Sequence, residues 1–182
     1  MRRLTIALLA GSLLICCTIK NKDSKIFDDL IGKEDIVIVL SMYGLDSVPK
    51  EIGQLQNVKS LTIVKDSSKG WTIYPPVSAL TQRVDVPPFT RLPDEILELK
   101  SLTTLSLIDL NLKTLPDDFN KLENLETLDL TLNKLTISNE MTKLNGLKKL
   151  KHLALFGNRV DSIDIQELKK ENSNLEIESS YE

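Results

Sequence analysis

The chain has 182 residues, of which 41% are hydrophobic and 27% charged, and this balance is typical of one globular domain. Aromatic residues make up only 4%, so the core must be filled by Leu, Ile and Val. The formal net charge of −3 argues against a nucleic-acid partner, because affinity for nucleic acid depends on clustered Lys and Arg side chains that neutralise phosphates.

Residues 1–16 have the layout of a secretory signal peptide. Arg2 and Arg3 precede an uncharged apolar stretch, residues 4–15. As a helix these twelve residues cover about 18 Å, whereas the hydrocarbon core of a bilayer is about 30 Å thick. The stretch is therefore predicted to direct export, and it is too short to span a membrane.

Two adjacent cysteines, Cys16 and Cys17, follow this stretch and are the only cysteines in the chain. The segment from Leu13 to Thr18 resembles the lipobox of bacterial lipoproteins, in which a cysteine becomes the first mature residue and carries acyl chains. The family's small residue before the modified cysteine favours Cys17, with Cys16 as the alternative; the pair can also be read as part of a plain hydrophobic leader. The resemblance implies an exported protein, lipid-anchored to a bacterial cell membrane (outer membrane, periplasmic side or cell surface) through a polar tether, residues 17–24.

Residues 25–35 are predicted to form an N-terminal cap. A short amphipathic helix is expected over residues 24–31, with Ile26, Phe27, Leu30 and Ile31 on its apolar side. Such a cap is needed if the following residues form a stack of coils, because a bare terminal coil exposes leucines and an open strand edge.

A repeat of 21 to 25 residues begins at residue 36. The pattern Leu-x-x-Leu-x-Leu occurs at 102–107, 125–130 and 150–155, and a Pro-x-x-apolar-x-x-Leu pattern recurs between repeats, after Val48, Leu92 and Leu115. The middle position of the first pattern extends to a series of seven: Ile38, Leu61, Val84, Leu105, Leu128, Leu153 and Leu175. A fixed period of this length indicates a solenoid.

These motifs resemble the leucine-rich repeat family, in its subclass LxxLxLxxNxLxxLPxxIxxLxxL, over residues 36–178. The resemblance implies a right-handed, curved α/β solenoid, with short parallel strands on the concave face and helical, 3₁₀ or irregular turns on the convex face. Residues 36–182 would then form about seven turns and a C-terminal cap. The family's asparagine, which bonds to backbone at the bend, is present at Asn133 and Asn158. Other residues replace it elsewhere, namely Tyr43, Asp66, Phe89 and Leu110.

The third turn and the C-terminal end depart from the pattern. Between Val64 and Leu92 the sequence is rich in proline and aromatic residues, and a short strand is expected at residues 84–86 inside a distorted coil. This turn is either a protruding specificity loop or a decayed repeat whose aromatics fill a gap. At the C-terminus Ile163, Ile165 and Leu168 are expected to cover the last coil, ahead of Leu175 and an acidic strand that discourages edge pairing.

Alternate residues of each strand should point outward, forming three columns on the concave face. The central column is predicted as Val39, Thr62, Asp85, Ser106, Asp129, Ala154 and Glu176. Candidate partner-binding residues on this face are Val64, Arg83, Asp85, Thr104, Ser106, Ile108, Thr127, Asp129, Thr131, His152 and Phe156. Val64, Ile108 and Phe156 would form an apolar strip on this face, although packing of the core does not require apolar residues at these positions. The strip therefore indicates a contact surface, with Phe156 and His152 as its anchor. The alternative is that scattered exposed apolar residues are normal.

Catalysis is not expected. Ser106, Asp129 and His152 occur on three consecutive predicted strands, but Asp129 would lie one strand over and two residues along from His152. That is about 8 Å between Cβ atoms, where relay bonds need about 2.6 to 3.2 Å. With one histidine in the chain and cysteines only in the leader, neither a metal site nor a cofactor is predicted.

The sequence therefore predicts a non-enzymatic protein–protein interaction module, a membrane-anchored leucine-rich repeat lipoprotein of the bacterial cell envelope that binds a protein with its concave face. Two alternatives stay open: a binder of glycans or envelope polymers, and a structural, self-associating envelope protein. The identity of the partner, the leaflet and the oligomeric state are not specified by the sequence.

Overall fold

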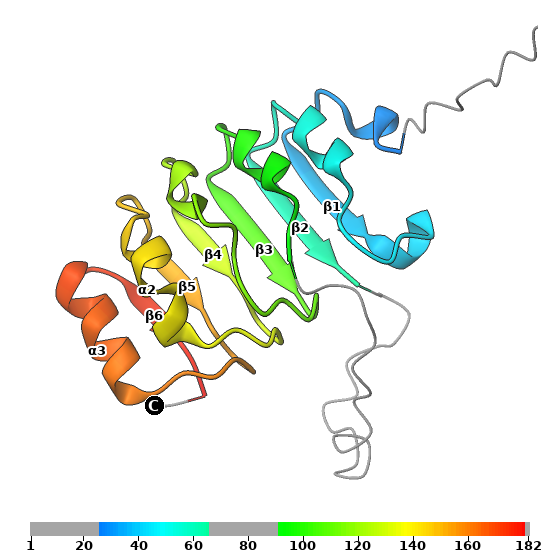
Figure 1. Cartoon of the computed structure of the whole chain (residues 1–182). Coiled ribbons are helices and arrows are strands. Elements are labelled where there is room, and N and C mark those ends of the chain that lie inside the picture. The colour runs from blue at the N-terminus through cyan, green and yellow to red at the C-terminus, as the bar shows by residue number, and fades with distance from the viewer. Residues whose placement is uncertain (1–25, 66–90, 181–182) are drawn as a thin grey trace, which may run out of the picture.

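The computed structural model describes residues 26–65 and 91–180 of the chain. Its central element is a six-stranded sheet in which each strand pairs in parallel with the next one along the chain (Figure 1). The strands are β1 (Asp35–Val39), β2 (Ser60–Val64), β3 (Thr104–Ile108), β4 (Thr127–Asp129), β5 (His152–Ala154) and β6 (Glu176–Glu178). Each connection leaves the end of one strand and returns to the start of its neighbour, so the chain forms a stack of coils.

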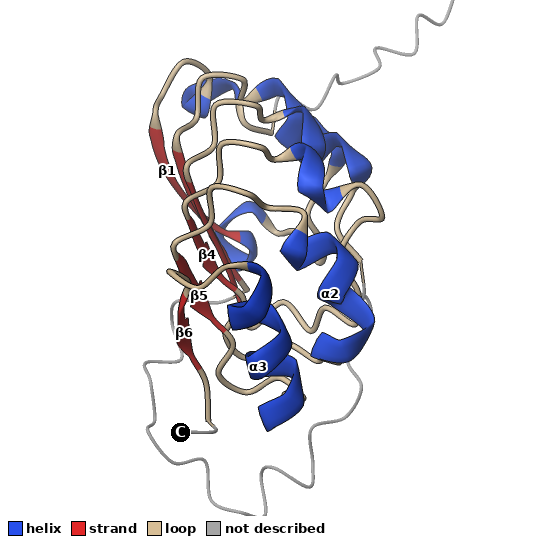
Figure 2. Ribbon diagram, turned by 90° about the vertical axis from the view of Figure 1, so that its left-hand side faces the viewer, coloured by secondary structure: helices blue, strands red, loops and turns tan. Residues whose placement is uncertain are grey.

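The returning half of each coil lies on one side of the sheet, and Figure 2 shows helices and strands as two opposed layers. The first coils return through 3₁₀ helices, and the last two through longer α-helices. The 3₁₀ helices are η1 (Asp28–Leu30), η2 (Leu40–Tyr43), η3 (Lys50–Gln54), η4 (Asp94–Glu98) and η5 (Phe119–Lys121), and the α-helices are α2 (Ile137–Asn145) and α3 (Ser162–Glu171). None of the helices in the described residues is long and apolar enough to cross a membrane.

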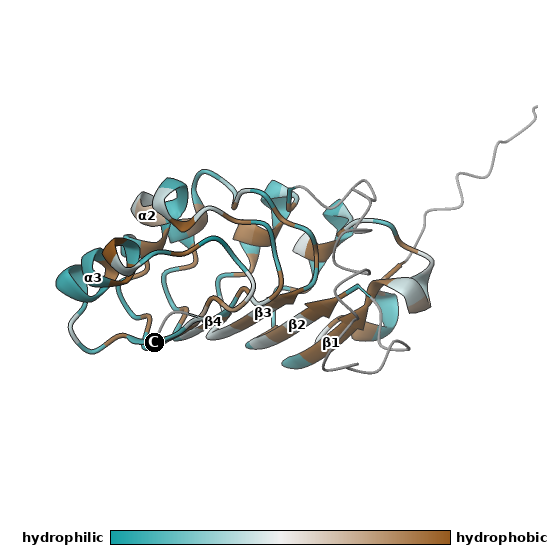
Figure 3. Ribbon diagram, turned by 90° about the horizontal axis from the view of Figure 1, so that it is seen from below, coloured by the Kyte–Doolittle hydropathy of each residue, from teal (hydrophilic) through white to brown (hydrophobic). Residues whose placement is uncertain are grey.

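The core lies between these two layers and runs the length of the stack. Leu105 and Leu107 of β3, for example, are fully buried, whereas Thr104, Ser106 and Ile108 on the same strand face outward and are partly exposed. Figure 3 shows β1 and β2 coloured as largely hydrophobic and α3 as largely hydrophilic. Two-residue alternation in the strands therefore produces one continuous aliphatic core, and the predicted α/β repeat solenoid is confirmed.

Asparagines close the bends of the later coils, as predicted. The buried Asn133 side chain accepts hydrogen bonds from the backbone N–H groups of Leu110 and Leu112, at 3.1 Å each. It donates to the carbonyl oxygens of Leu107 and Leu130. Asn158 repeats part of this pattern one coil later, where it accepts from the N–H of Leu135 and donates to the same Leu130 carbonyl. Each asparagine thus bonds its own coil to the one before it.

The prediction that the third turn contributes a strand to the sheet is wrong. Residues 84–86 were expected to form a strand between those at residues 61 and 105, but β2 pairs directly with β3 over five residues, from Ser60↔Thr104 to Val64↔Ile108. This pairing uses the ladder edges of both strands and leaves no place for a strand between them. The sheet of the described residues has five gaps between neighbouring strands, or about 24 Å of stacking. Residues 66–90 themselves lie outside the described part of the chain.

The predicted register is also wrong at both ends of the sheet. Ile36, not Ile38, is the partner of Leu61, and Ile177, not Leu175, is the partner of Leu153. Both errors are shifts of two residues. In strands with period-two alternation such a shift leaves every side chain on its own face, so the hydrophobic pattern cannot detect it.

At the N-terminal end, the cap is a 3₁₀ turn rather than the expected amphipathic helix. Phe27 and Leu30 are buried over the first coil, but Ile31 is 53% exposed. The Phe27 ring meets the edge of the Tyr43 ring at a centroid distance of 5.4 Å. Burial, followed by the nearby Asp29 carboxylate, raises the pKa of the Tyr43 phenol.

At the C-terminal end, α3 supplies the cover. Its N-terminus is closed by a capping box: the Asp161 side chain accepts from the N–H of Asp164, and the Asp164 side chain accepts from the N–H of Asp161. Leu168 is buried, as expected, but Ile163 is 63% exposed and does not join the core. The cap is therefore carried by one face of α3.

Candidate binding face

The sheet surface that points away from the helices is the face predicted to be concave, and we call it the open sheet face. The strand register arranges its outward side chains in three rows. The first row is Asp35, Ser60, Thr104, Thr127, His152 and Glu176. The second row is Val37, Thr62, Ser106, Asp129, Ala154 and Glu178. The third row is Val39, Val64 and Ile108, beyond which Thr131 and Phe156 follow the ends of β4 and β5.

The structure places most of the predicted site residues on this face. The pairings Thr104↔Thr127, Thr127↔His152 and Ser106↔Asp129 match the predicted columns. The end strands enter the rows two residues away from the prediction, so that Val37 rather than Val39 lies beside Thr62, and Glu178 rather than Glu176 lies beside Ala154. Arg83 and Asp85 lie outside the described residues, and the direct pairing of β2 with β3 removes their predicted place in the rows.

Phe156 and His152, the predicted anchor of the contact surface, do not lie together in the structure. His152 begins β5 and Phe156 follows its end, so the two residues lie at opposite margins of the open sheet face. Four residues of extended chain separate them by about 13 Å. Val64 and Ile108 are only partly exposed, whereas Phe156 is 40% and Val37 67% exposed. Val37 was not among the candidate residues, and the observed register of β1 places it beside Thr62.

A shallow hollow of about 220 Å³ lies over the β3–β6 part of the open sheet face. Ala154 is one of its lining residues, and it stands in the second row between the longer side chains of Asp129 and Glu178. The hollow is lined by Ser106, Thr127, Leu128, Asp129, His152, Leu153, Ala154, Glu176 and Glu178. The hollow therefore contains one small residue that stands between two carboxylates.

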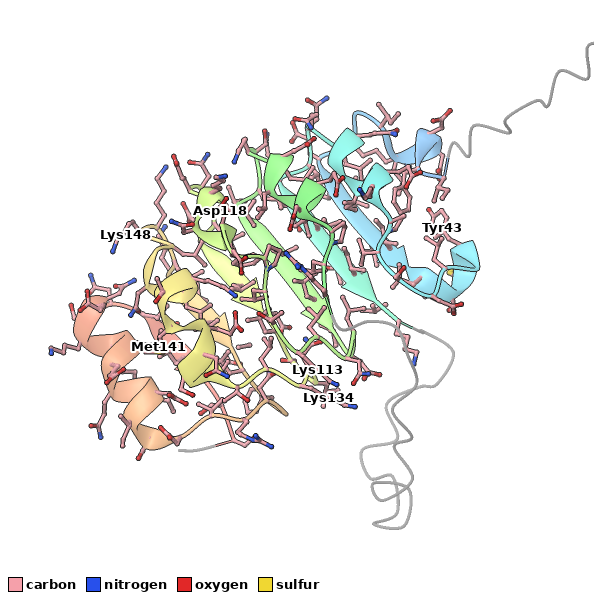
Figure 4. The ribbon with its side chains drawn as sticks, in the orientation of Figure 1. Tyr43, Lys113, Asp118, Lys134, Met141 and Lys148 are labelled. Carbon is pink, nitrogen blue, oxygen red and sulfur yellow. The ribbon has the colours of Figure 1, made fainter. Side chains whose placement is uncertain are left out.

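The open sheet face is acidic at one end. Its fifteen outward strand positions include four carboxylates and one histidine but no Lys or Arg. Asp35 is alone on β1, whereas Asp129, Glu176 and Glu178 lie on β4 and β6 around the hollow. Lysines lie at the margins instead: Figure 4 shows Lys113 and Lys134 beyond one end of the strands and Lys148 near the opposite margin.

Hydrogen bonds hold two of the charged groups of the hollow in place. The Asp129 Oδ1 atom accepts from the N–H of Thr131 at 2.9 Å, and His152 Nδ1 lies 2.8 Å from Glu176 Oε2. The strand neighbour of Asp129 is Ala154, so Asp129 stands one strand over and two residues along from His152, as predicted. Ser106, Asp129 and His152 thus do not form a catalytic relay.

Ion pairs between neighbouring coils line the margin where the strands begin. The Lys59 Nζ atom lies 2.8 Å from Glu34 Oε2, and the Lys151 Nζ atom lies 2.7 Å from Glu126 Oε2. The hydrogen bond from Lys151, followed by the charge of the same ammonium group, lowers the pKa of the Glu126 carboxyl. Lys151 directly precedes His152, which lines the hollow. The ion pair with Glu126 holds the Lys151 ammonium group at the margin of the face.

The carboxylates do not form a metal centre. Among the residues that the structure describes, no group of three or more His, Cys, Asp or Glu side chains is close enough to hold a metal ion. Asp129 and Glu178 stand on strands separated by β5, which puts their Cα atoms about 10 Å apart.

Comparisons with known proteins add little to this description. No family model and no curated protein matches the chain. Among solved structures, a leucine-rich repeat protein of Leptospira interrogans is similar, with 29% sequence identity and a TM-score of 0.45 over 74% of this chain. The match covers 34% of that protein, so the chain corresponds to about a third of its length.

Proposed function

We propose that this leucine-rich repeat protein is a non-enzymatic protein-binding module whose partner docks on the open sheet face. The observation that carries the proposal is the division of the described chain into two layers: the returning helices lie on one side of the sheet, and no described helix covers the outward side chains on the other side (Figure 2). A surface that is held rigid from beneath and combines polar, aliphatic and aromatic side chains suits a protein partner.

Rigidity supports the proposal because binding then requires little reordering. The side chains beneath the face, such as Leu105, Leu128 and Leu153, are at most 1% exposed. The asparagine bonds at the bends fix the backbone from one coil to the next. A preformed surface loses less conformational entropy on association than a flexible one.

The glycan alternative has less support. Sugar sites usually need exposed aromatic platforms, and within the described residues Phe156 is the only aromatic side chain on or beside the open sheet face. Self-association through the ends of the sheet is disfavoured at β6, where Glu176 and Glu178 point outward.

The binding test compares Phe156→Asp with Ile163→Asp, which places the same charge on α3, away from the open sheet face. The bait is the full chain, crosslinked in intact cells and then purified under denaturing conditions. We expect wild type and Ile163→Asp to capture the same partner and Phe156→Asp to lose it, with all three melting temperatures within a few degrees. Equal capture by both variants, or equal loss, would contradict the proposal.

We further propose that the chain is an exported lipoprotein of the cell envelope, anchored through Cys17. Support comes from the sequence alone, since residues 1–25 lie outside the described part of the chain. Cells fed a radiolabelled fatty acid should label wild type and Cys16→Ala but not Cys17→Ala, which should also leave the membrane fraction. Labelling of Cys17→Ala and not of Cys16→Ala would move the anchor to Cys16, and no label in wild type would exclude it.

A further inference from the structure

We infer that the hollow over Ala154 receives an arginine side chain from an extended segment of the protein partner. The inference rests on the proposed function and specifies the chemistry of the partner. It names an occupant for the acidic end of the open sheet face, which no layer of the described chain covers.

Geometry is the first argument. Asp129, Ala154 and Glu178 occupy successive places in one row, each about 4.8 Å from the next. A planar guanidinium group lying on the Ala154 methyl has a carboxylate on either side and N–H groups that point toward both. A lysine ammonium is a compact point charge without the planar fork of N–H groups that matches carboxylates on two opposite sides.

Charge is the second argument. Three carboxylates line the hollow, and no Lys or Arg does. The neighbouring cation, Lys151, is bound to Glu126 at the margin, and His152 faces Glu176, which leaves Asp129 and Glu178 as the acceptors of the second row. Because the Thr131 N–H holds Oδ1 of Asp129, that carboxylate is oriented before the partner arrives.

The surroundings indicate why the arginine belongs to an extended segment. The hollow is small, about 220 Å³, and its lining residues lie on β3 to β6, so a chain that crosses these strands keeps its backbone above the sheet while one side chain enters. Phe156, two residues beyond Ala154 on the same chain, offers an exposed apolar surface to a neighbouring residue of that segment. Arginine over the hollow and an apolar residue over Phe156 form the expected recognition pair.

The test uses fluorescein-labelled peptides built from Gly-Ser-Gly-Arg repeats, with matched peptides that carry lysine or uncharged citrulline in place of arginine. Binding to the full chain is measured by fluorescence anisotropy. We expect the arginine peptide to bind at least about 10-fold more tightly than the citrulline peptide, because two charge-assisted hydrogen bonds are lost. It should also bind more tightly than the lysine peptide.

Variants then locate the binding. The double variant Asp129→Asn with Glu178→Gln keeps the shape of the hollow and the acceptor for Thr131, and it should weaken binding of the arginine peptide by about 10-fold or more. The control Asp35→Asn removes one carboxylate from the far end of the same face and should leave binding nearly unchanged. Equal affinity for citrulline, tighter binding of lysine, or equal weakening by Asp35→Asn would overturn the inference.

Failure of the inference is distinguishable from failure of the proposed function. If the crosslinked partner depends on Phe156 but is neither displaced by the arginine peptide nor affected by Asp129→Asn with Glu178→Gln, the open sheet face binds protein and the arginine assignment is wrong. If neither set of substitutions changes capture, the partner binds elsewhere and both proposals fall. Displacement by the arginine peptide, together with loss in the double variant, supports both.

Discussion

Single buried polar side chains join neighbouring coils of this solenoid. Asn133 is 2% exposed, and its amide contacts backbone groups of two coils. The fold uses a side chain here because the bend leaves backbone N–H groups without a ladder partner, and a buried N–H without an acceptor is costly.

Replacing Asn133 should therefore destabilise the chain more than replacing Asn158, its counterpart one coil later. We expect Asn133→Ala to lower the free energy of unfolding by about 2 to 4 kcal/mol, because the N–H groups of Leu110 and Leu112 both lose their acceptor. Asn158→Ala removes the acceptor of one N–H group, that of Leu135, and should cost about half as much. Urea denaturation followed by circular dichroism measures both values; equal costs would contradict the ladder account.

Glu140 is a buried charge that the sequence analysis missed. It lies on α2 and is 2% exposed, and its carboxylate accepts from the Leu115 N–H at 3.2 Å and from Lys143 Nζ at 2.9 Å. It also accepts from the Thr114 hydroxyl. The only sequence signal is a glutamate three residues before a lysine on a helix, and on most helices that pair is exposed.

Removal of this carboxylate should be far more costly than removal of an exposed one. We expect Glu140→Ala to destabilise the chain by about 3 kcal/mol, since the buried Leu115 N–H loses its acceptor and the partly buried Lys143 ammonium group loses the carboxylate that neutralises it. Glu34→Ala, which breaks the exposed pair with Lys59, should cost less than about 1 kcal/mol. Similar losses in urea titrations of the two variants would show that Glu140 is not a structural link.

At the scale of elements, the two α-helices begin differently. Asp161 caps α3 with its side chain, whereas Thr136, at the same position of α2, makes no side-chain capping bond. The first turn of α2 is instead held by tertiary contacts, including the Ile137 N–H, which bonds to the carbonyl of Arg159.

This difference gives a matched pair of substitutions. Asp161→Ala should destabilise the chain by about 1 kcal/mol and increase amide hydrogen exchange in the first turn of α3, because the N–H groups of Ile163 and Asp164 lose their acceptor. Thr136→Ala should change stability by less than about 0.5 kcal/mol. Unchanged exchange in α3 of Asp161→Ala would argue that packing, not the cap, sets the start of that helix.

At the scale of the whole molecule, stability depends on stacking. The described coils share one core from Phe27 to Leu175, and each strand is hydrogen-bonded to its neighbours in the sheet. β3 has partners on both sides, whereas β6 is a three-residue strand at the edge with its inward Ile177 only partly buried. The free energy of local opening should therefore differ along the stack.

Hydrogen exchange followed by mass spectrometry should show slow exchange in β2, β3 and β4 and faster exchange in β6. A substitution in the middle of the core, Leu105→Ala, is expected to cost about 2 to 5 kcal/mol and to accelerate exchange in its neighbours β2 and β4. Acceleration confined to β3 would mean that the coils are stabilised independently of one another.

The sequence by itself determined the fold class and the inward and outward faces of the strands. Leu105, Leu128 and Leu153 recur at a fixed period, and alternation of apolar and polar residues is a local property of the chain that needs no knowledge of its neighbours. The same local pattern located Ser106, Asp129 and His152 on consecutive strands and separated Asp129 from His152.

Only the tertiary structure decided which strands are neighbours, where the sheet begins and ends, and where a hollow forms. Which strands pair is decided by hydrogen bonds between segments that are distant in the sequence. The alternation of apolar and polar residues therefore could not reveal the direct pairing of β2 with β3 or the two-residue shifts at β1 and β6. The hollow depends on those partners as well, because the register decides that Glu178 rather than Glu176 stands beside Ala154. The hydrophobic periodicity can be determined from each segment of the chain alone, whereas the strand register depends on how two segments pair.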